Sequence, residues 1–186
     1  MQTTTVNAAL KSVVQVAIAT ALLLLVPLLA MRFTGEVQWT ALDFVVAGAM
    51  LFAAGLSFVL LAKGTRDISY RVGAAIAVMA ALMLVWGNLA VGLIGSENNP
   101  ANLMYAGVLA IEIIGALVAR GRAQGMSRAL SATAIAQAVV AAVALADGLG
   151  ASEPPGRLGI MVLNGFFLAL FAASAWLFAR AARSNR

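Results

Sequence analysis

Long runs without charged residues divide the chain into six apolar segments. Residues 12–31, 44–62, 72–96, 129–146 and 158–179 contain no Asp, Glu, Lys or Arg, and residues 98–119 contain a single one, Glu112. An α-helix needs about 20 predominantly apolar residues to cross the hydrocarbon core of a bilayer. Because the apolar runs are continuous and do not alternate with polar residues, they predict transmembrane helices and not the strands of a β-barrel.

Turn-forming residues separate the apolar segments. They cluster near residues 34–36, 95–100 and 147–156, and such clusters mark the turns between helices. We therefore predict an all-α membrane protein with a single six-helix domain and these approximate spans: 12–33, 41–62, 72–95, 101–119, 129–147 and 158–180. The first apolar run exceeds the usual length of a signal-peptide core and lacks a clear cleavage site, so we expect it to remain as a helix.

The composition indicates that a bilayer is the solvent. Hydrophobic residues make up 63% and charged residues 10% of the chain, against about 45–50% and about 25% in soluble domains. Histidine and cysteine are absent, which excludes His-ligated haem, thiolate zinc sites, iron–sulfur clusters and catalysis by either residue type. We also find no nucleotide-binding loop and no nucleophile–base pair. We therefore expect no enzyme activity, no catalytic residue, no cofactor and no metal ion.

The basic residues are distributed unevenly between alternate connecting segments. Of the 12 Lys and Arg, Arg32 and Arg157 fall in the first, third or fifth connection, and the others lie near the termini or in the second and fourth connections. Since Lys and Arg accumulate on the cytoplasmic side, both termini are expected to be cytoplasmic. The basic segments are too short to form a nucleic-acid-binding surface. Membrane lipid, a second copy of the chain or a subunit of a membrane complex are the expected partners.

The charges also recur at regular intervals. A basic residue precedes each odd-numbered segment and follows each even-numbered one: Lys11, Arg71, Arg128 and Lys63, Arg120, Arg180. The first three are 60 and 57 residues apart, and the second three are 57 and 60 apart. One interpretation is an internal repeat of three parallel hairpins that arose by duplication, as in some transporters. The other is that similar helix lengths and the positive-inside rule impose the same spacing.

Small residues recur at four-residue spacing in the later segments. They include Ala134, Ala138, Ala142 and Ala146 in the fifth segment and Gly165, Ala169 and Ala173 in the sixth. Between helices in lipid, small side chains let the backbones approach closely and gain van der Waals contact. We therefore expect these faces to lie inside the helical bundle.

Glu112 is the charged residue in the middle of a predicted span. It precedes Arg120 by eight residues, which is about 12 Å at 1.5 Å per residue and places it near the bilayer midplane. An ionised carboxylate at this depth costs about 2.5–3.5 kcal/mol, so a neutral acid is expected. Three interpretations remain open: a proton- or cation-binding group of a small transporter or channel, a hydrogen-bonding group between helices, or a contact to a partner subunit.

Four other polar residues fall inside the predicted spans. Counted from the basic residues at the span ends, Gln137 and Thr20 lie near the depth of Glu112, and Asn88 and Asn164 share a level nearer the outer side. We expect Gln137 to be the hydrogen-bond partner of Glu112, because a short connection joins their helices. Each residue alone is typical of contacts between helices, and together they could form a two-level polar track.

Two functional hypotheses follow from these features. The first is a small transporter or channel in which Glu112 binds a proton or cation. The second is a non-catalytic accessory or scaffold subunit of a membrane protein complex. A polar cavity that reaches Glu112 would favour transport, whereas a dry bundle with an apolar face of small residues left open to lipid would favour a subunit.

One segment resembles a known group of proteins. Residues 86–105, WGNLAVGLIGSENNPANLMY, resemble a stretch found in small uncharacterised bacterial integral membrane proteins, and the resemblance extends to about residue 128. It covers roughly a quarter of the chain. The resemblance implies a location in the bacterial inner membrane. It implies no particular activity and assigns no site residue.

Overall fold

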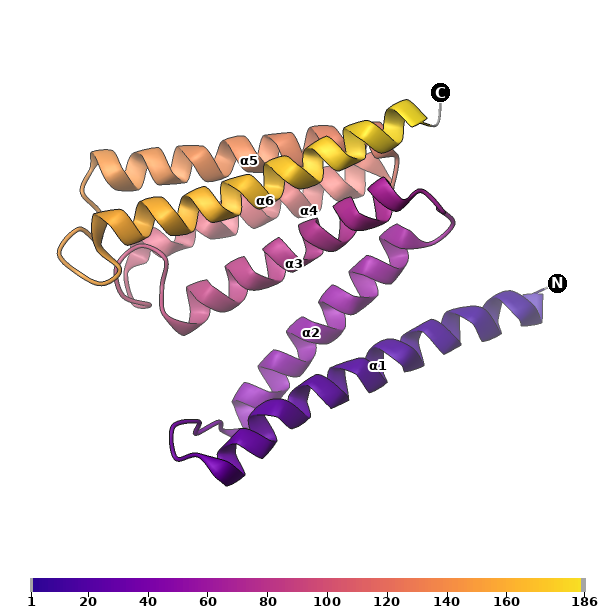
Figure 1. Ribbon diagram of the computed structural model, residues 1–186, viewed down its shortest axis with the longest axis horizontal. Helices are drawn as coiled ribbons and strands as arrows, with labels where there is room; N and C mark the ends of the chain where they lie inside the picture. Colours follow the sequence, from indigo (N-terminus) through magenta and orange to yellow (C-terminus); the bar gives the residue numbers. More distant parts are fainter. Residues whose placement is uncertain (1, 185–186) are drawn as a thin grey trace. The chain divides into compact units, whose positions relative to one another are not determined.

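The computed structural model describes residues 2–184, with the side chains of residues 10–184, and the described chain is helical throughout apart from its turns (Figure 1). The elements are α1 (Gln2–Phe33), α2 (Ala41–Ala62), α3 (Ile68–Ala90), the short 3₁₀ helix η1 (Pro100–Leu103), α4 (Met104–Ala119), α5 (Ala123–Ala146) and α6 (Gly156–Ser184). Six helical segments are long and apolar enough to cross a membrane. The prediction of an all-helical, multi-pass membrane protein is confirmed.

Two helices begin earlier than the charge pattern predicts. α3 starts at Ile68, where the Asp67 carboxylate accepts a hydrogen bond from the backbone N–H of Tyr70 at 2.9 Å. α5 starts at Ala123, so Arg71 and Arg128 lie within the first turns of their helices. A long arginine side chain can extend along a helix to reach the headgroups. A basic residue at a span end therefore does not mark the first residue of the helix.

The chain divides into two compact units, Met1–Lys63 and Gly64–Arg186. In the first unit, α1 and α2 form an antiparallel hairpin (Figure 1). A Cβ atom on Gly55 would lie 2.8 Å from Val16 Cγ1, and one on Gly48 would lie 3.3 Å from Leu24 Cδ1. Glycine in α2 therefore lets the two helices approach closely, as expected for helices that pack in lipid.

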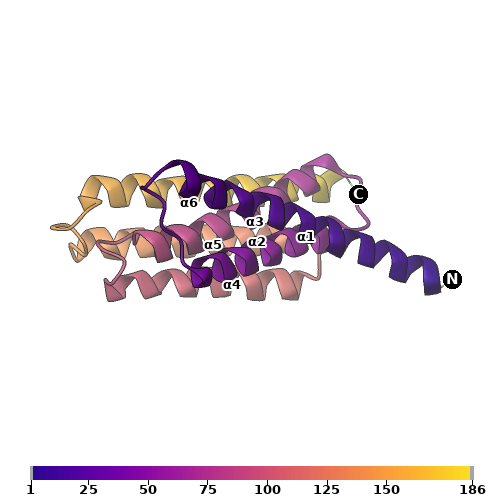
Figure 2. The same cartoon turned by 90° about the horizontal axis from the view of Figure 1, so that it is seen from below.

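The second unit contains α3, α4, α5 and α6. Its helices α4, α5 and α6 lie side by side in chain order, and α3 packs against α6 (Figures 1 and 2). α3 touches α4 only slightly, although one loop joins them. The second predicted hairpin is therefore not a tightly packed pair of helices. Duplication of three hairpins stays a prediction.

Close contacts in the second unit occur where one helix presents a glycine. A Cβ atom on Gly115 of α4 would lie 2.7 Å from the Cβ of Ala129 of α5, and one on Gly125 would lie 2.9 Å from the Cβ of Ala119. Between α3 and α6, the Ser174 hydroxyl donates a hydrogen bond to the carbonyl oxygen of Gly73 at 2.8 Å. A glycine therefore lies at a close contact of α3 with α6 and at a close contact of α4 with α5.

The expectation for the small-residue face of α6 is wrong. Gly165, Ala169 and Ala173 are exposed, and α6 instead buries a face that includes Phe171 and Phe178, both at 0% exposure. α6 contacts both α3 and α5. Its large aromatic side chains fill the space among three helices, which small residues would leave empty. On the predicted small-residue face of α5, Ala134 is buried, whereas Ala142 and Ala146 are exposed.

The second unit has two different ends. We call the end with the α3–α4 and α5–α6 loops the long-loop end, and the end with the α4–α5 connection the short-loop end. At the long-loop end, Gly95 and Gly150 approach each other so closely that a Cβ atom on Gly150 would overlap the backbone nitrogen of Gly95. Glu153 Oε2 accepts a hydrogen bond from the backbone N–H of Ser96 at 2.9 Å. The two loops therefore form one packed cap.

Asn102 of η1 organises the α3–α4 loop. Its Oδ1 accepts hydrogen bonds from the backbone N–H groups of Leu93 and Ile94 at 3.0 and 2.9 Å, and its Nδ2 donates to the carbonyl oxygen of Ser96 at 2.8 Å. These backbone groups follow the end of α3 and have no helical partner. Since a buried backbone polar group without a partner is costly, the asparagine side chain allows this loop to be buried.

Alanine at Gly150 should destabilise the fold more than alanine at Gly148. Both residues have a positive φ, of 67° and 66°, which costs an L-residue about 1–2 kcal/mol. Only Gly150 meets the opposite loop, because nothing lies within 4 Å of a Cβ atom on Gly148. Overpacking adds about 1–3 kcal/mol. Denaturant titration in bicelles measures both losses, and equal losses would show that the two loops do not pack together.

Candidate functional site

One face of α4 lines the interior of the second unit. Its buried residues lie along one stripe, at spacings of one or two turns: Tyr105, Val108, Glu112 and Ala119. Ile113, Ile114, Leu117 and Val118 on the other faces are 58–77% exposed, as expected for side chains that face lipid. Glu112 is 7% exposed. The helical period therefore turns the acid away from lipid and into the four-helix unit.

Glu112 is an acid without a partner among the residues that the structure describes. Its Oε2 atom is buried and has no hydrogen-bond partner. Over the same described residues, no group of three or more His, Cys, Asp or Glu could hold a metal ion. Glu112 is therefore a single acidic group in the interior of the unit, with no counter-ion among these residues.

A second set of polar residues joins three helices. The Tyr105 hydroxyl of α4 and the Gln137 Nε2 of α5 both donate to Asn164 Oδ1 of α6, each at 2.9 Å. Asn164 Nδ2 donates to the carbonyl oxygen of Ile160, one turn earlier in α6, at 2.8 Å. Tyr105, Gln137 and Asn164 are each at most 1% exposed. We call these three residues the amide cluster.

The hydrogen bonds of the amide cluster determine which atom of Gln137 stays unpaired. Asn164 directs its nitrogen to Ile160, so its oxygen is the atom that faces Tyr105 and Gln137. Gln137 must then present its nitrogen to that oxygen. Its own Oε1 is buried and has no hydrogen-bond partner among the described residues. The hydrogen bonds of the cluster therefore determine which atom of the Gln137 amide is the oxygen.

The expected hydrogen bond between Glu112 and Gln137 is not present among the described residues, since Gln137 binds Asn164 instead. The contacts of Gly115 with Ala129 and of Gly125 with Ala119 place residue 107 of α4 level with Gln137. Gln137 therefore lies about 7–8 Å further along the bundle than Glu112. The sequence estimate of depth was wrong because it used Arg128 as the start of α5.

The remaining predicted site residues lie in different places. Asn88 of α3 donates through Nδ2 to the carbonyl oxygen of Asn102 at 3.4 Å, and its Oδ1 is buried without a partner among the described residues. Thr20 is buried at 9% exposure but belongs to the first unit, so its predicted level with Glu112 stays a prediction. Of the predicted site residues, Gln137 and Asn164 form a direct hydrogen bond.

Tyr105 is a member of the amide cluster that the sequence did not identify as a site residue. It lies near the start of α4, where an aromatic residue is typical of the membrane interface. The available signal was its position two helical turns before Glu112, which places both residues on one face of the helix. A tyrosine that is 1% exposed is also expected to find a hydrogen-bond partner.

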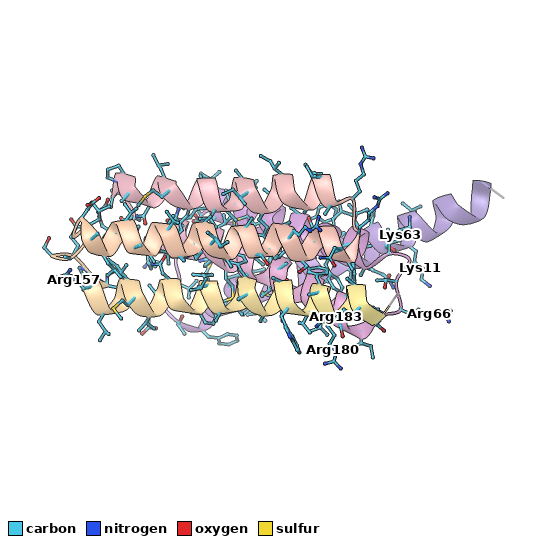
Figure 3. All side chains as sticks on the ribbon, turned by 90° about the horizontal axis from the view of Figure 1, so that it is seen from above. Lys11, Lys63, Arg66, Arg157, Arg180 and Arg183 are labelled. Carbon is cyan, nitrogen blue, oxygen red and sulfur yellow. The ribbon has the colours of Figure 1, made fainter. Side chains whose placement is uncertain are left out.

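The charged residues of the second unit lie at its two ends. Figure 3 shows Arg180 and Arg183 at the short-loop end and Arg157 at the long-loop end. Arg157 donates a hydrogen bond to the carbonyl oxygen of Leu145 at 3.1 Å, near the end of α5. The Arg180 guanidinium lies 5.8 Å from the centre of the Trp176 ring, a cation–π distance. Glu112 is thus remote from both charged ends.

Comparison of the chain with known proteins identifies no relative: no protein-family model, no curated protein and no solved structure matches it. The resemblance of residues 86–128 to bacterial integral membrane proteins therefore stays a prediction. The protein is a multi-pass membrane protein with one buried glutamate.

The two amides of the cluster should differ in their contribution to stability. Asn164→Leu leaves the Tyr105 hydroxyl and the Gln137 Nε2 buried without an acceptor, which should lower the free energy of unfolding by about 1–3 kcal/mol. Gln137→Leu leaves the Tyr105–Asn164 bond intact and removes an unpaired oxygen, so the change should stay within about 0.5 kcal/mol. Unfolding by SDS in bicelles measures both values. A larger loss in Gln137→Leu would contradict this network.

Proposed function

We propose that the protein is a small transporter or channel of the bacterial inner membrane, in which Glu112 binds the translocated proton or cation. The observation that supports this proposal is a buried carboxyl group in the middle of a membrane-spanning helix, without a counter-ion among the described residues. Ionisable residues at such positions are rare and mark proton relays and ion pathways. The protein is accordingly not an enzyme and uses no cofactor.

A proton suits Glu112 better than a metal cation does. Metal cations such as Ca²⁺ take six to eight oxygen ligands, whereas Glu112 has no second acid beside it among the described residues. Thr133 lies close to its level on α5, and its hydroxyl donates to the carbonyl oxygen of Ala129 at 3.0 Å. That hydroxyl oxygen can still accept a hydrogen bond. One carboxyl group and few neutral oxygens can hold a proton but cannot complete the coordination shell of a metal ion.

The charge distribution supports an orientation with both termini in the cytoplasm. At the short-loop end of the second unit the chain has Arg120, Arg122, Arg180 and Arg183. The loops of the opposite end contain Glu97, Asp147 and Glu153. Since basic residues stay on the cytoplasmic side, the long-loop end faces outward. Lipid and a second copy of the chain or another membrane protein are the proposed partners, and nucleic acid is not.

Glu112→Gln should abolish proton movement and leave the fold intact. Glutamine retains the shape and polarity of the neutral acid but cannot release a proton. The purified protein is reconstituted into liposomes that contain a pH-sensitive dye, and a potassium diffusion potential drives proton uptake. The wild-type protein should acidify the lumen faster than protein-free liposomes do, and Glu112→Gln should match the protein-free rate.

The control for this assay is Glu97→Gln. Glu97 is exposed in the α3–α4 loop, so that the variant makes the same substitution without touching the interior. It should conduct protons at the wild-type rate. Equal fluxes in the wild-type protein and Glu112→Gln would reject the role of Glu112 in proton movement.

The orientation can be tested with single cysteines, because the chain contains none. Asn98 and Gln124 are exposed, the first in the long loop after α3 and the second in the first turn of α5. An impermeant thiol reagent added to intact spheroplasts should label Asn98→Cys and spare Gln124→Cys. Labelling of Gln124→Cys alone would reverse the orientation, and labelling of both would contradict the number of spans between them.

One observation supports an accessory or scaffold subunit as the second candidate. The exposed stripe of Gly165, Ala169 and Ala173 on α6 would permit close approach of a helix from another chain. In that function Glu112 is a structural group, and Glu112→Gln should retain the association of the protein with its complex. Replacement of Ala169 by Leu should instead prevent the association without any effect on proton flux.

A further inference from the structure

Three buried side-chain oxygens of the second unit have no hydrogen-bond partner among the residues that the structure describes. They are Asn88 Oδ1, Glu112 Oε2 and Gln137 Oε1. The two amides cannot resolve this by exchanging oxygen and nitrogen, because each nitrogen already donates a hydrogen bond. The two amide oxygens are therefore acceptors that need a donor, and the Glu112 oxygen needs a hydrogen-bond partner whether or not it carries the proton. Leaving a buried acceptor without one costs about 1–3 kcal/mol.

The three oxygens are spread from the middle of the bundle toward the long-loop end. Gln137 lies about 7–8 Å closer to that end than Glu112, by the register of α4 and α5. Asn88 lies near the end of α3 and binds the backbone of Asn102, next to the long loop. Asn88 is also partly exposed. The acceptors thus extend from Glu112 to a residue that reaches the surface.

Large apolar side chains fill much of the opposite half of the unit. Met126, Leu130, Phe171 and Phe178 occupy this half and are at most 1% exposed.

Two hydroxyl groups in this half both donate to backbone carbonyls. Ser174 Oγ donates to Gly73 at 2.8 Å, and Tyr70 Oη donates to Gly121 at 2.7 Å. No unpartnered buried side-chain atom among the described residues lies between Glu112 and the short-loop end. The pattern of unpaired acceptors is therefore one-sided.

We propose that these oxygens line a path of internal water that connects Glu112 with the aqueous phase at the long-loop end only. Water can donate to the two amide oxygens and can either donate to or accept from the Glu112 carboxyl group, and buried water molecules typically make about three hydrogen bonds. Water oxygens about 2.8 Å apart would need about two molecules to connect Glu112 with Gln137. The Tyr105 hydroxyl, which donates to Asn164, has lone pairs that can bind the same chain.

The path determines how Glu112 gains and loses its proton. A hydronium ion at the inner end of the path transfers a proton to the Glu112 carboxylate, so that an O–H bond of hydronium breaks and the O–H bond of the acid forms. One water molecule remains. In the conformation that the structure describes, release follows the reverse step toward the same side, and delivery of the proton to the other side requires a second conformation. This inference rests on the proposed role of Glu112 as a proton-binding group and adds the side from which the proton arrives.

The other titratable groups in the interior of the unit are neutral tyrosines. Among the described residues, α3 buries Tyr70, α4 buries Tyr105 beside Glu112 on its own face, and α5 and α6 bury no titratable side chain. Tyr70 lies at the short-loop end, where it binds Gly121. No second acid or base therefore competes with Glu112 for the proton in this region.

The test is the protonation of Glu112 in sealed vesicles whose two faces are held at different pH. A hydrophobic carbodiimide reacts with protonated carboxylic acids inside membranes, and mass spectrometry of the Glu112 peptide measures the extent of reaction. With the full-length protein, the labelling rate should follow the pH at the long-loop face, with a change of up to tenfold per pH unit. The pH at the short-loop face should have no effect until a protonophore equalises the two sides.

Two variants examine the path itself. Gln137→Leu removes the middle acceptor and should slow the response of labelling to the pH at the long-loop face by at least tenfold. The matched control is Ser174→Ala, which removes a buried hydroxyl on the other side of Glu112 and should leave the response unchanged. The sided measurement on the wild-type protein tests the path independently of both variants.

The outcomes separate this inference from the proposed function. Labelling that follows the pH at the short-loop face, or at both faces equally, overturns the one-sided path and leaves Glu112 as a proton-binding group. An unchanged response in well-folded Gln137→Leu overturns the role of the acceptors. Labelling that is independent of pH on both faces, with a protonophore present, rejects proton binding by Glu112 and with it the proposed function.

Discussion

In the hydrocarbon core of a bilayer, a polar atom can be satisfied only by another group of the protein or by internal water. This constraint organises the second unit. The Asn102 side chain accepts hydrogen bonds from two backbone N–H groups after α3 and donates one to a backbone carbonyl, and Asn164 accepts two hydrogen bonds from neighbouring helices. Where the constraint is not met by the described residues, at Asn88, Glu112 and Gln137, a further hydrogen-bond partner is needed. The functional proposals follow from these three atoms.

The same solvent explains how the helices pack. Lipid tails are as apolar as leucine, so that helices associate through close contact and not through the exclusion of water. Gly55 in the α1–α2 hairpin and Gly115 between α4 and α5 lie where the side chains of the opposite helix come closest. α6 uses a different solution, because it contacts two helices and fills the space between them with Phe171 and Phe178. In the two close helix pairs, glycine allows the backbones to approach.

The interior of the second unit is divided by depth. Toward the short-loop end it is closed by large apolar side chains, and the hydroxyl groups of Tyr70 and Ser174 bind backbone carbonyls. Toward the long-loop end it contains the amide cluster and Asn88. Glu112 lies between these two regions. An acid at such a boundary can exchange a proton with one side of the membrane while the other side stays sealed, which is the arrangement that a half-open transport pathway requires.

The sequence by itself determined the class of the protein and the number of its spans. Charge-free runs of about 20 residues have few alternatives to a membrane helix, because the thickness of the bilayer sets their length. The sequence also identified Glu112 as the unusual acid, since a charge inside such a run is costly wherever the run packs. These conclusions depend on local composition and on the solvent.

Only the tertiary structure decided which polar side chains meet. The depth of Gln137 depended on where α5 begins, and α5 begins five residues before Arg128. The sequence therefore paired Gln137 with Glu112, whereas in the structure Gln137 binds Asn164. The buried face of α6 and the slight contact between α3 and α4 were also beyond the sequence. Pairing between helices depends on register and on rotation about each helix axis, and a difference of one turn changes every partner while the hydrophobic pattern stays the same.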